Sequence, residues 1–246
     1  MKFRTILACA VLGLVIFNGR LNAAVESDVV GYTTVEITKE YTLLGVSFFN
    51  LDDSTQDTIA INDFVTGDFT HGDQLQVPKE TGSSYDIAIW NETEGKWCTS
   101  RRGQPTTTAS TIEIKKGDGV WLLSKSATET TPVEIVLKGR ALISATATYN
   151  CAQQYRLVSL PTYDSVPVNS TKLEWTNLQH GDQIQIPKST GNSYDVAVWN
   201  STLSKWCTSR RGQPTTTEST LAFSPYSAAW VVSTSDAASC TYDSTK

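Results

Sequence analysis

Two adjacent arginines occur twice in this chain, each time inside the same segment, SRRGQPTTT. The first pair is Arg101 and Arg102, and the second is Arg210 and Arg211. A guanidinium group donates several hydrogen bonds in a planar fork that matches the oxygens of a carboxylate or sulfate. The segment therefore predicts a site for an anionic group, for example on an acidic sugar. The alternative is internal ion pairing with the repeated carboxylates Asp73, Asp86, Asp182 and Asp195.

Tryptophans are repeated as well, at Trp90 and Trp97 and again at Trp199 and Trp206. Aromatic residues in strand-like runs are most simply interpreted as core or half-buried sheet residues. The alternative is a platform on which sugar rings stack beside the arginines. The ligand-binding set predicted on that alternative is Trp90, Trp97, Arg101, Arg102, Trp199, Trp206, Arg210 and Arg211.

Histidine occurs only at His71 and His180, both in the motif HGDQ. A metal site usually gathers three or four ligands, and one neighbouring aspartate is too few, so we expect turn residues there. A two-histidine site requires that the fold bring the two turns together. The chain has no nucleophile motif, phosphate loop, CxxC or HExxH. We therefore expect no catalytic residue, no metal and no cofactor.

The longest repeat sets the organisation of the chain. His71–Ser124 aligns with His180–Ser233 without a gap, 109 positions apart, with 33 of 54 pairs identical. A long-period repeat of this kind indicates two copies of one folding unit, so we expect the same strand topology in both. Beyond the first residues no helical periodicity is sustained. Short runs rich in Val, Ile, Thr, Tyr and Trp, separated by Gly, Pro, Asn, Asp and Ser, predict strands and turns.

The strands predicted for the first copy are Val29–Ile37, Tyr41–Phe49, Gln74–Val77, Tyr85–Trp90, Lys96–Arg101, Ser110–Ile114, Val120–Ser124 and Val133–Lys138. The strands predicted for the second copy are Leu142–Thr148, Tyr155–Leu160, Gln183–Ile186, Tyr194–Trp199, Lys205–Arg210, Ser219–Phe223, Ala229–Ser233 and Cys240–Asp243. The pattern predicts an all-β protein of two tandem homologous units, each a β-sandwich or a small β-barrel. Alternation puts Tyr85, Ile87 and Ile89 on one strand face and Ala88 on the other.

The chain is expected to divide into a signal peptide at 1–24, a first β unit at 25–139 and a second at 140–246. The boundary leaves little linker, so the units are expected to pack together. Long loops are predicted only at Asn50–Thr70 and Thr162–Gln179.

An export signal is predicted from the first residues. Lys2 and Arg4 precede the apolar run Ile6–Phe17, and Asn18–Ala24 is a small, polar exit. The run is too short to span a bilayer, which takes about 20 apolar residues. We expect cleavage, a secreted or periplasmic location and no membrane span in the mature chain.

Charge argues against one class of partner. The whole chain has a net charge of −5, and cleavage would remove three basic residues and no acid. The balance would then be 17 basic (20 − 3) against 25 acidic residues, a net of −8. Nucleic acid is therefore not an expected partner, because its phosphates attract basic surfaces.

Four cysteines remain after the predicted cleavage. Cys98 and Cys207 lie on equivalent strands, whereas Cys151 follows the first strand of the second copy and Cys240 begins its last strand. If those two strands pair antiparallel, the Cα atoms could come within the roughly 7 Å that a disulfide needs. We predict a Cys151–Cys240 disulfide, with Cys98 and Cys207 as buried thiols or paired across the units.

The motifs SDVVGYTTVEI, YTLLGVSFFN, HGDQLQV…YDIAIW…GKW and KKGDGVWLL resemble a group of exported β-rich proteins of the verrucomicrobial bacteria. Units of that group open with a VVGY-like strand and end in a Gly-acid-Gly-aromatic turn. The resemblance covers most of the mature chain and implies a two-unit, exported all-β protein. The second copy departs from it, because Tyr226-Ser227-Ala228 replaces Gly117-Asp118-Gly119.

A duplicated surface suits attachment better than catalysis, since one asymmetric active site needs no second copy. We expect a non-enzymatic structural or adhesive protein of the cell envelope or extracellular space. The alternative is a carbohydrate-binding protein that uses the repeated Trp/Arg surfaces, and an enzyme comes third. The expected partner is a glycan or another envelope protein.

Overall fold

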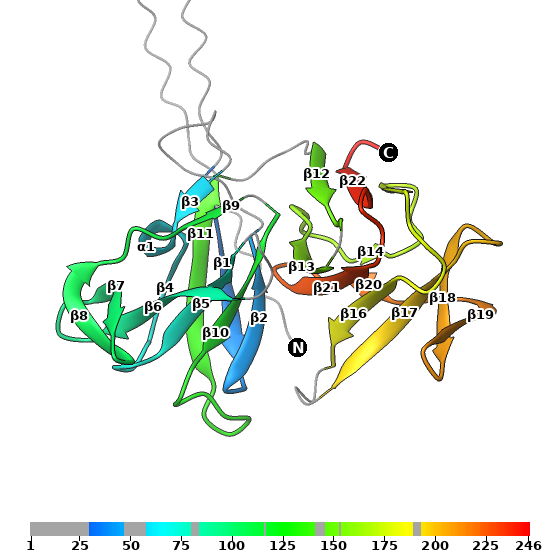
Figure 1. Ribbon diagram of the computed structural model, residues 1–246. Helices are drawn as coiled ribbons and strands as arrows, with labels where there is room; N and C mark the ends of the chain where they lie inside the picture. The colour runs from blue at the N-terminus through cyan, green and yellow to red at the C-terminus, as the bar shows by residue number, and fades with distance from the viewer. Residues whose placement is uncertain are drawn as a thin grey trace, which may run out of the picture.

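The structure is a computed structural model that describes residues 30–46, 58–79, 84–115, 117–140, 146–152, 154–188 and 193–246. The predicted signal peptide lies outside the described residues. Two units of similar architecture lie side by side, the first on the left and the second on the right of Figure 1. No helix in the described ranges is both long and apolar enough to cross a bilayer.

The first unit runs from β1 to β11 along the chain. Its elements are β1 (Val30–Ile37), β2 (Tyr41–Gly45), β3 (Thr58–Ala60), α1 (Ile61–Phe64), β4 (Val65–Gly67), β5 (Gln74–Pro78), β6 (Tyr85–Asn91), β7 (Lys96–Arg101), β8 (Gln104–Ala109), β9 (Glu113–Lys115), β10 (Gly119–Leu123) and β11 (Val133–Arg140). They form a six-stranded sheet of order β2-β10-β5-β6-β7-β8, a three-stranded sheet β1-β11-β4 and the pair β3-β9.

The second unit repeats this topology strand for strand. Its elements are β12 (Thr146–Asn150), β13 (Gln154–Ser159), β14 (Val166–Pro167), β15 (Leu173–Thr176), β16 (Gln183–Pro187), β17 (Tyr194–Asn200), β18 (Lys205–Arg210), β19 (Gln213–Glu218), β20 (Ala222–Phe223), β21 (Ala228–Ser233) and β22 (Ser239–Asp243). The sheet orders are β13-β21-β16-β17-β18-β19, β12-β22-β15 and β14-β20. The prediction of an all-β chain with two homologous units is therefore confirmed.

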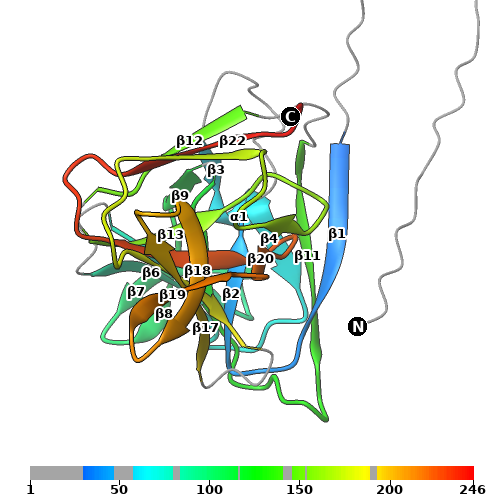
Figure 2. The same cartoon turned by 90° about the vertical axis from the view of Figure 1, so that its right-hand side faces the viewer.

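Each unit is built as a sandwich around one apolar core. In the first unit the core joins Leu44, Leu75 and Leu122 of the six-stranded sheet to Ile37 and Ile135 of the three-stranded sheet. All five side chains are at most 1 % exposed. First and last strands close each unit, because β1 pairs antiparallel with β11 and β12 with β22. Figure 2 shows β12 and β22 side by side.

The strands that the sequence missed are short or polar. The predicted long loop Asn50–Thr70 contains β3, α1 and β4 within its described part, and Thr162–Gln179 contains β14 and β15. Elements of two to four residues are too short to show a period. The predicted strand Ser110–Ile114 is also wrong in position, because β8 precedes it and β9 begins only at Glu113.

The alternation in β6 is correct, although Tyr85 and Ile87 lie on the face away from the main core. Ala88 is fully buried in the core of the first unit, whereas Tyr85 is 38 % and Ile87 39 % exposed. Tyr194 of the second unit is likewise 37 % exposed. The six-stranded sheets therefore carry apolar residues on both faces.

Part of that outer face joins the two units. Leu43 of β2 and Leu157 of β13 form a separate buried cluster with Ala228, and Trp121 and Trp230 pack against it. The cluster is two-fold-like, since Leu43 and Leu157 occupy equivalent strands and the two tryptophans do likewise. Both six-stranded sheets extend outward from this junction (Figure 1).

Reciprocal hydrogen bonds complete the junction. The Gly45 amide donates to the Tyr226 carbonyl oxygen at 2.8 Å, and the Ser159 amide donates to the Gly117 carbonyl oxygen at 2.8 Å. Because Gly45 corresponds to Ser159 and Gly117 to Tyr226, the two bonds are the same contact made in both directions. An ion pair between Arg156 and Asp118, 2.6 Å apart, has no copy.

The divergent turns that the sequence singled out are junction residues. Gly117 has φ +79°, and a Cβ there would overlap the ring of Tyr149. Tyr226 keeps the same left-handed backbone, with φ 58°, and its side chain packs against the core of the first unit. Burial raises the pKa of Tyr226, against the opposing effect of a hydrogen bond with the Thr33 side chain. The two copies therefore differ where each must fit the other.

The predicted Cys151–Cys240 disulfide is wrong, because Cys98, Cys151, Cys207 and Cys240 are all buried free thiols. The predicted strand pairing does occur, but its register puts Cys240 opposite Tyr149. The Cys151 amide donates to the Ala238 carbonyl oxygen, at 2.8 Å, so the two cysteines are diagonal rather than direct neighbours. Diagonal partners lie about 7–8 Å apart, beyond the usual span of a disulfide.

Candidate functional site

The repeated segment SRRGQPTTT forms the tip of a β-hairpin in each unit. In the first unit Arg101 of β7 pairs with Gln104 of β8, which leaves a two-residue turn, Arg102-Gly103. Both turn residues have positive φ, 52° at Arg102 and 76° at Gly103. Positive φ at both central positions defines a type I′ turn, whose twist matches that of the two strands. The hairpin β18–β19 repeats the pairing of Arg210 with Gln213.

An arginine at the first turn position is costly. That position of a type I′ turn favours Asn, Asp or Gly. For most other residues the left-handed conformation costs about 1–2 kcal/mol, because the Cβ atom lies too close to the following carbonyl oxygen. Arg211 has φ 53°, so both copies retain the same strained residue. Backbone strain that persists is a reason to look for a function of the side chain.

Arg101, Arg102, Arg210 and Arg211 are all exposed, and no described acidic side chain forms an ion pair with any of them. The internal pairing that the sequence left open does not occur. Asp86 pairs instead with Lys79 at 3.1 Å, and Asp195 pairs with Lys188 at 3.3 Å. The guanidinium groups are therefore available to a ligand.

Asp73 and Asp182, the other suggested partners, have a structural role. Asp73 is fully buried, and its carboxylate accepts hydrogen bonds from the Thr70 and Lys125 amides at 3.0 and 2.9 Å. Asp182 accepts equivalent bonds from the Gln179 and Thr234 amides, both at 2.9 Å. The aspartate of the HGDQ motif thus ties the turn before β5 or β16 to the end of β10 or β21.

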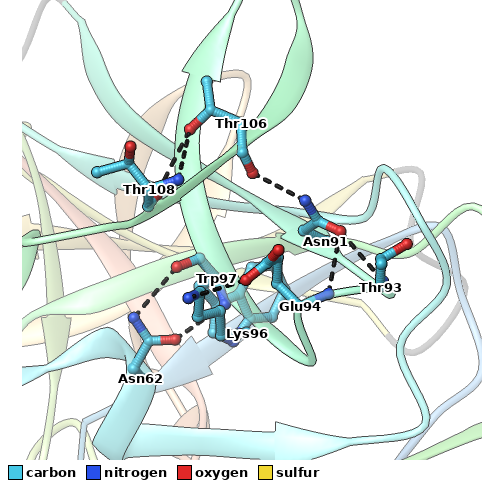
Figure 3. Close-up of polar contacts among 8 residues, drawn as sticks. All are labelled: Asn62, Asn91, Thr93, Glu94, Lys96, Trp97, Thr106 and Thr108. Atoms are coloured by element: carbon cyan, nitrogen blue, oxygen red, sulfur yellow. Dashed lines mark hydrogen bonds and ion pairs between the residues drawn. The ribbon is translucent and has the colours of Figure 1, made fainter.

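Asparagine side chains hold the hairpins in place, as Figure 3 shows for the first unit. The Asn91 amide donates to the Thr106 carbonyl oxygen at 2.8 Å and accepts from the Thr93 and Glu94 amides. Asn200 makes the same contacts, donating to Thr215 at 3.0 Å. One buried amide therefore fixes both the β6–β7 turn and the start of β8.

A second asparagine, Asn62, which sequence reasoning missed, contacts β7 from the predicted long loop. Asn62 accepts a hydrogen bond from the Trp97 amide at 2.9 Å and donates to the Trp97 carbonyl oxygen at 3.2 Å (Figure 3). Asn169 makes the same pair of contacts with Trp206, both at 2.9 Å. Asn62 and Asn169 lie outside the gapless repeat, 107 rather than 109 positions apart. Only an alignment with a gap would have matched them.

Hydroxyl groups line the hairpin below each turn. Thr99 and Thr106 share a hydrogen bond of 2.6 Å across the strands, and Thr208 and Thr215 share another of 2.6 Å. The strand register shifts beside Thr99, where three residues of β8 face one residue of β7. Arginines, glutamine and threonines therefore form one exposed polar surface on each hairpin.

The tryptophan platform is not available at two of its predicted positions. Trp97 and Trp206 are fully buried, so neither ring can stack on a sugar. Trp97 makes edge-to-face contacts with Phe69 and Trp90, with ring centroids 4.7 and 5.3 Å away. Trp90 and Trp199 are half-buried and pack against the cores. The core interpretation of these residues therefore fits the structure, and the arginines are the exposed part of the predicted set.

Neither histidine belongs to a cluster of potential metal ligands among the described residues. His71 and His180 are both exposed turn residues. No group of three potential metal ligands occurs among the described residues. Cys98 and Cys207 lie at the hairpin bases, where burial raises the pKa of each thiol.

A shallow cleft of about 470 Å³ lies beside the junction. Its lining includes the ion pairs Lys79–Asp86 and Asp118–Arg156, so these four charges are matched within the protein. The cleft contains no predicted site residue.

Comparison with known proteins adds no relative. No protein-family model matches this chain, and searches of curated proteins and of solved structures also found no match. The resemblance to the verrucomicrobial exported proteins stays a prediction. Function is therefore inferred from the geometry of this chain.

Proposed function

We propose that this chain is an exported, non-enzymatic structural or adhesive protein that presents two identical binding hairpins on one rigid body. The observation that carries the proposal is the pair of exposed arginine turns, which share their sequence, their backbone conformation and their supporting network. The hairpins β7–β8 and β18–β19 lie at opposite ends of the molecule (Figure 1). A protein of this design can connect two surfaces or two polymer chains.

The junction supports a connector rather than two independent modules. Leu43 and Leu157 are at most 5 % exposed, and Tyr226 inserts against the core of the opposite unit. A close-packed interface resists movement of one unit relative to the other, because a small displacement breaks many contacts at once. The spacing between the two hairpins is therefore held by packing, and both hairpins can act together.

The alternative, a carbohydrate-binding protein, is favoured by the same hairpins and not by the tryptophans. The paired hydroxyls of Thr99 and Thr106 lie beside the arginines and can exchange hydrogen bonds with sugar hydroxyls. The two candidate functions are compatible, since adhesion to a polysaccharide would use this surface.

Cell-envelope binding tests the proposal. Purified mature protein would be mixed with isolated envelopes of the producing organism and sedimented. We expect the protein in the pellet, and we expect added protein to aggregate the envelope particles. A variant that carries Arg101→Asn and Arg102→Asn in the first unit alone should still sediment but should no longer aggregate particles. Recovery of the unmodified protein only in the supernatant would refute an adhesive role.

A further inference from the structure

We propose that the ligand of the two hairpins is an acidic polysaccharide, whose carboxylate or sulfate groups bind the arginine pairs at 101–102 and 210–211. This inference rests on the proposed function, because it names the ligand of the same hairpins. Four guanidinium groups without an acidic partner among the described residues stand on a chain whose net charge is −5. A cationic tip on an acidic protein restricts an anionic ligand to that tip.

The charges around each tip do not cancel the arginines. Lys96 pairs with Glu94 at 3.1 Å in the first unit, and Lys205 pairs with Glu218 at 2.6 Å in the second. The exposed repeated acids, Asp86 and Asp195, pair with Lys79 and Lys188. Each of these acids already has a cation, so the surplus positive charge of the hairpin belongs to its arginines.

The remaining polar groups fit a sugar rather than a bare anion. Gln104 and Thr108 are exposed, and Thr99 and Thr106 are joined at 2.6 Å. Amide and hydroxyl groups both donate and accept, as ring hydroxyls do. An anionic sugar residue would place its charged group on the guanidinium fork and its hydroxyls along the threonines.

The turn itself shows that the arginine is retained against a local preference. An Asn-Gly pair would suit the type I′ turn, yet both copies place arginine there, with φ 52° and 53°. A purely structural turn has no reason to keep that strain twice. We therefore interpret Arg102 and Arg211 as residues that contact the ligand.

Two identical sites on one body also explain a polymer ligand. A repeating polysaccharide offers many equivalent anionic groups, and the second contact is strengthened once the first is made. The hairpins lie at opposite ends of the molecule, so one protein can bridge separate chains or distant points of one chain (Figure 1).

Retention on immobilised polymers tests the inference. The probes are alginate (carboxylate), dextran sulfate (sulfate), neutral dextran and double-stranded DNA. The test variant is Arg102→Asn with Arg211→Asn, and the control is Lys79→Asn with Lys188→Asn, which removes the same charge from another repeated exposed position. We expect the unmodified protein and the control to be retained on at least one acidic polysaccharide and not on neutral dextran. The test variant should lose at least about tenfold in apparent affinity.

Thermal unfolding distinguishes a loss of binding from misfolding of the test variant. Asparagine is favoured in the type I′ turn, so the melting temperature should be unchanged or higher. Equal losses in the test variant and the control would overturn the inference, because they would indicate general charge attraction. Equal retention on DNA would overturn it in the same way. If the arginine variant still sediments with envelopes and aggregates them, the acidic polysaccharide is overturned as the ligand, whereas the adhesive role is not. If the unmodified protein fails to sediment with envelopes, the proposed adhesive function itself is overturned.

Discussion

The hairpin tips and the junction turns are both repeated, yet only the tips have kept their sequence. SRRGQPTTT is identical in the two units, whereas none of the nine aligned pairs from Ile112/Leu221 to Val120/Ala229 is identical. The junction turns contact the opposite unit, and the tips contact neither unit's core. Divergence therefore follows the contact between the units, and identity follows the surface that both units present to solvent.

The junction turns and the hairpin tips both contain residues in the left-handed backbone conformation, but the surroundings of these residues differ. At the junction, Gly117 is required by the ring of Tyr149, and its counterpart Tyr226 accepts strain in exchange for packing on the other core. At the tips, Arg102 and Arg211 accept the same strain with no packing in return. The difference is that strain at the junction is offset by packing inside the protein, whereas no packing contact among the described residues offsets the strain at the tips. This contrast is what motivates the proposed ligand role of the tips.

The largest effect is expected at the junction turn. Gly117→Ala should lower the free energy of unfolding by about 3 kcal/mol, from the left-handed backbone and from overlap with Tyr149. Tyr149 cannot move aside without losing its hydrogen bond to Ser159, at 2.8 Å. The matched control is Gly103→Ala at a tip, where nothing lies within 4 Å and only about 1 kcal/mol is at stake. Urea unfolding that showed equal losses would remove the contrast between the two turns.

Alkaline pH should weaken the second unit next, through the buried thiol of Cys151 in its core. Burial raises the pKa of Cys151 from 9.0 to about 12. The folded state therefore holds this proton more tightly than the unfolded state. Its stabilising effect is complete below pH 9 and is lost toward pH 12, at about 1.4 kcal/mol per pH unit. Between pH 9 and 11 we expect a loss of about 2–3 kcal/mol from Cys151 alone, measured by urea unfolding at each pH. Cys151→Ala should make the loss smaller without abolishing it, because burial also raises the pKa of the Cys240 thiol. An unchanged profile in that variant would contradict the assignment.

The hairpin clamps should contribute equally in both units. Asn91→Ala and Asn200→Ala each remove a buried donor and acceptor, so we expect each to cost about 1–2 kcal/mol of folding free energy. Hydrogen exchange should become faster in β8 for the first variant and in β19 for the second. A cost confined to one unit would show that the two hairpins are not supported alike.

The smallest effect should have the opposite sign. Arg102→Asn places the preferred residue in the type I′ turn and is expected to raise the free energy of unfolding by about 0.5–1 kcal/mol. The Arg211→Asn variant should behave the same way, because its φ is equal within 1°. A destabilised variant would mean that the arginine has a structural contact, and the argument from strain at the tips would fail. Chemical unfolding of the single variants is sensitive enough for this comparison.

The local pattern of apolar and turn residues was sufficient to predict the central strands of the first unit. Gln74–Val77, Tyr85–Trp90 and Lys96–Arg101 were predicted within one or two residues because β-branched and aromatic residues alternate between turn residues. β8 was missed because Gln104-Pro105-Thr106 has no apolar alternation, and its pairing depends on the turn at Arg102-Gly103. The repeat was enough to show that both copies share the arginine pairs, but whether the arginines pair internally depends on which cations Asp86 and Asp195 contact.

The sequence by itself determined that the protein is all-β, that it is two copies of one unit, and which charged segment both copies share. These follow from periodicity and repetition, which are local properties of the chain. Only the tertiary structure decided which tryptophans are buried, which face of β6 meets the core, and whether Cys151 reaches Cys240. Each of these depends on strand register and on contact between distant residues, and a shift of one or two positions changes the outcome. For the same reason, the role of Tyr226 became visible only when the second unit was seen packed against the first.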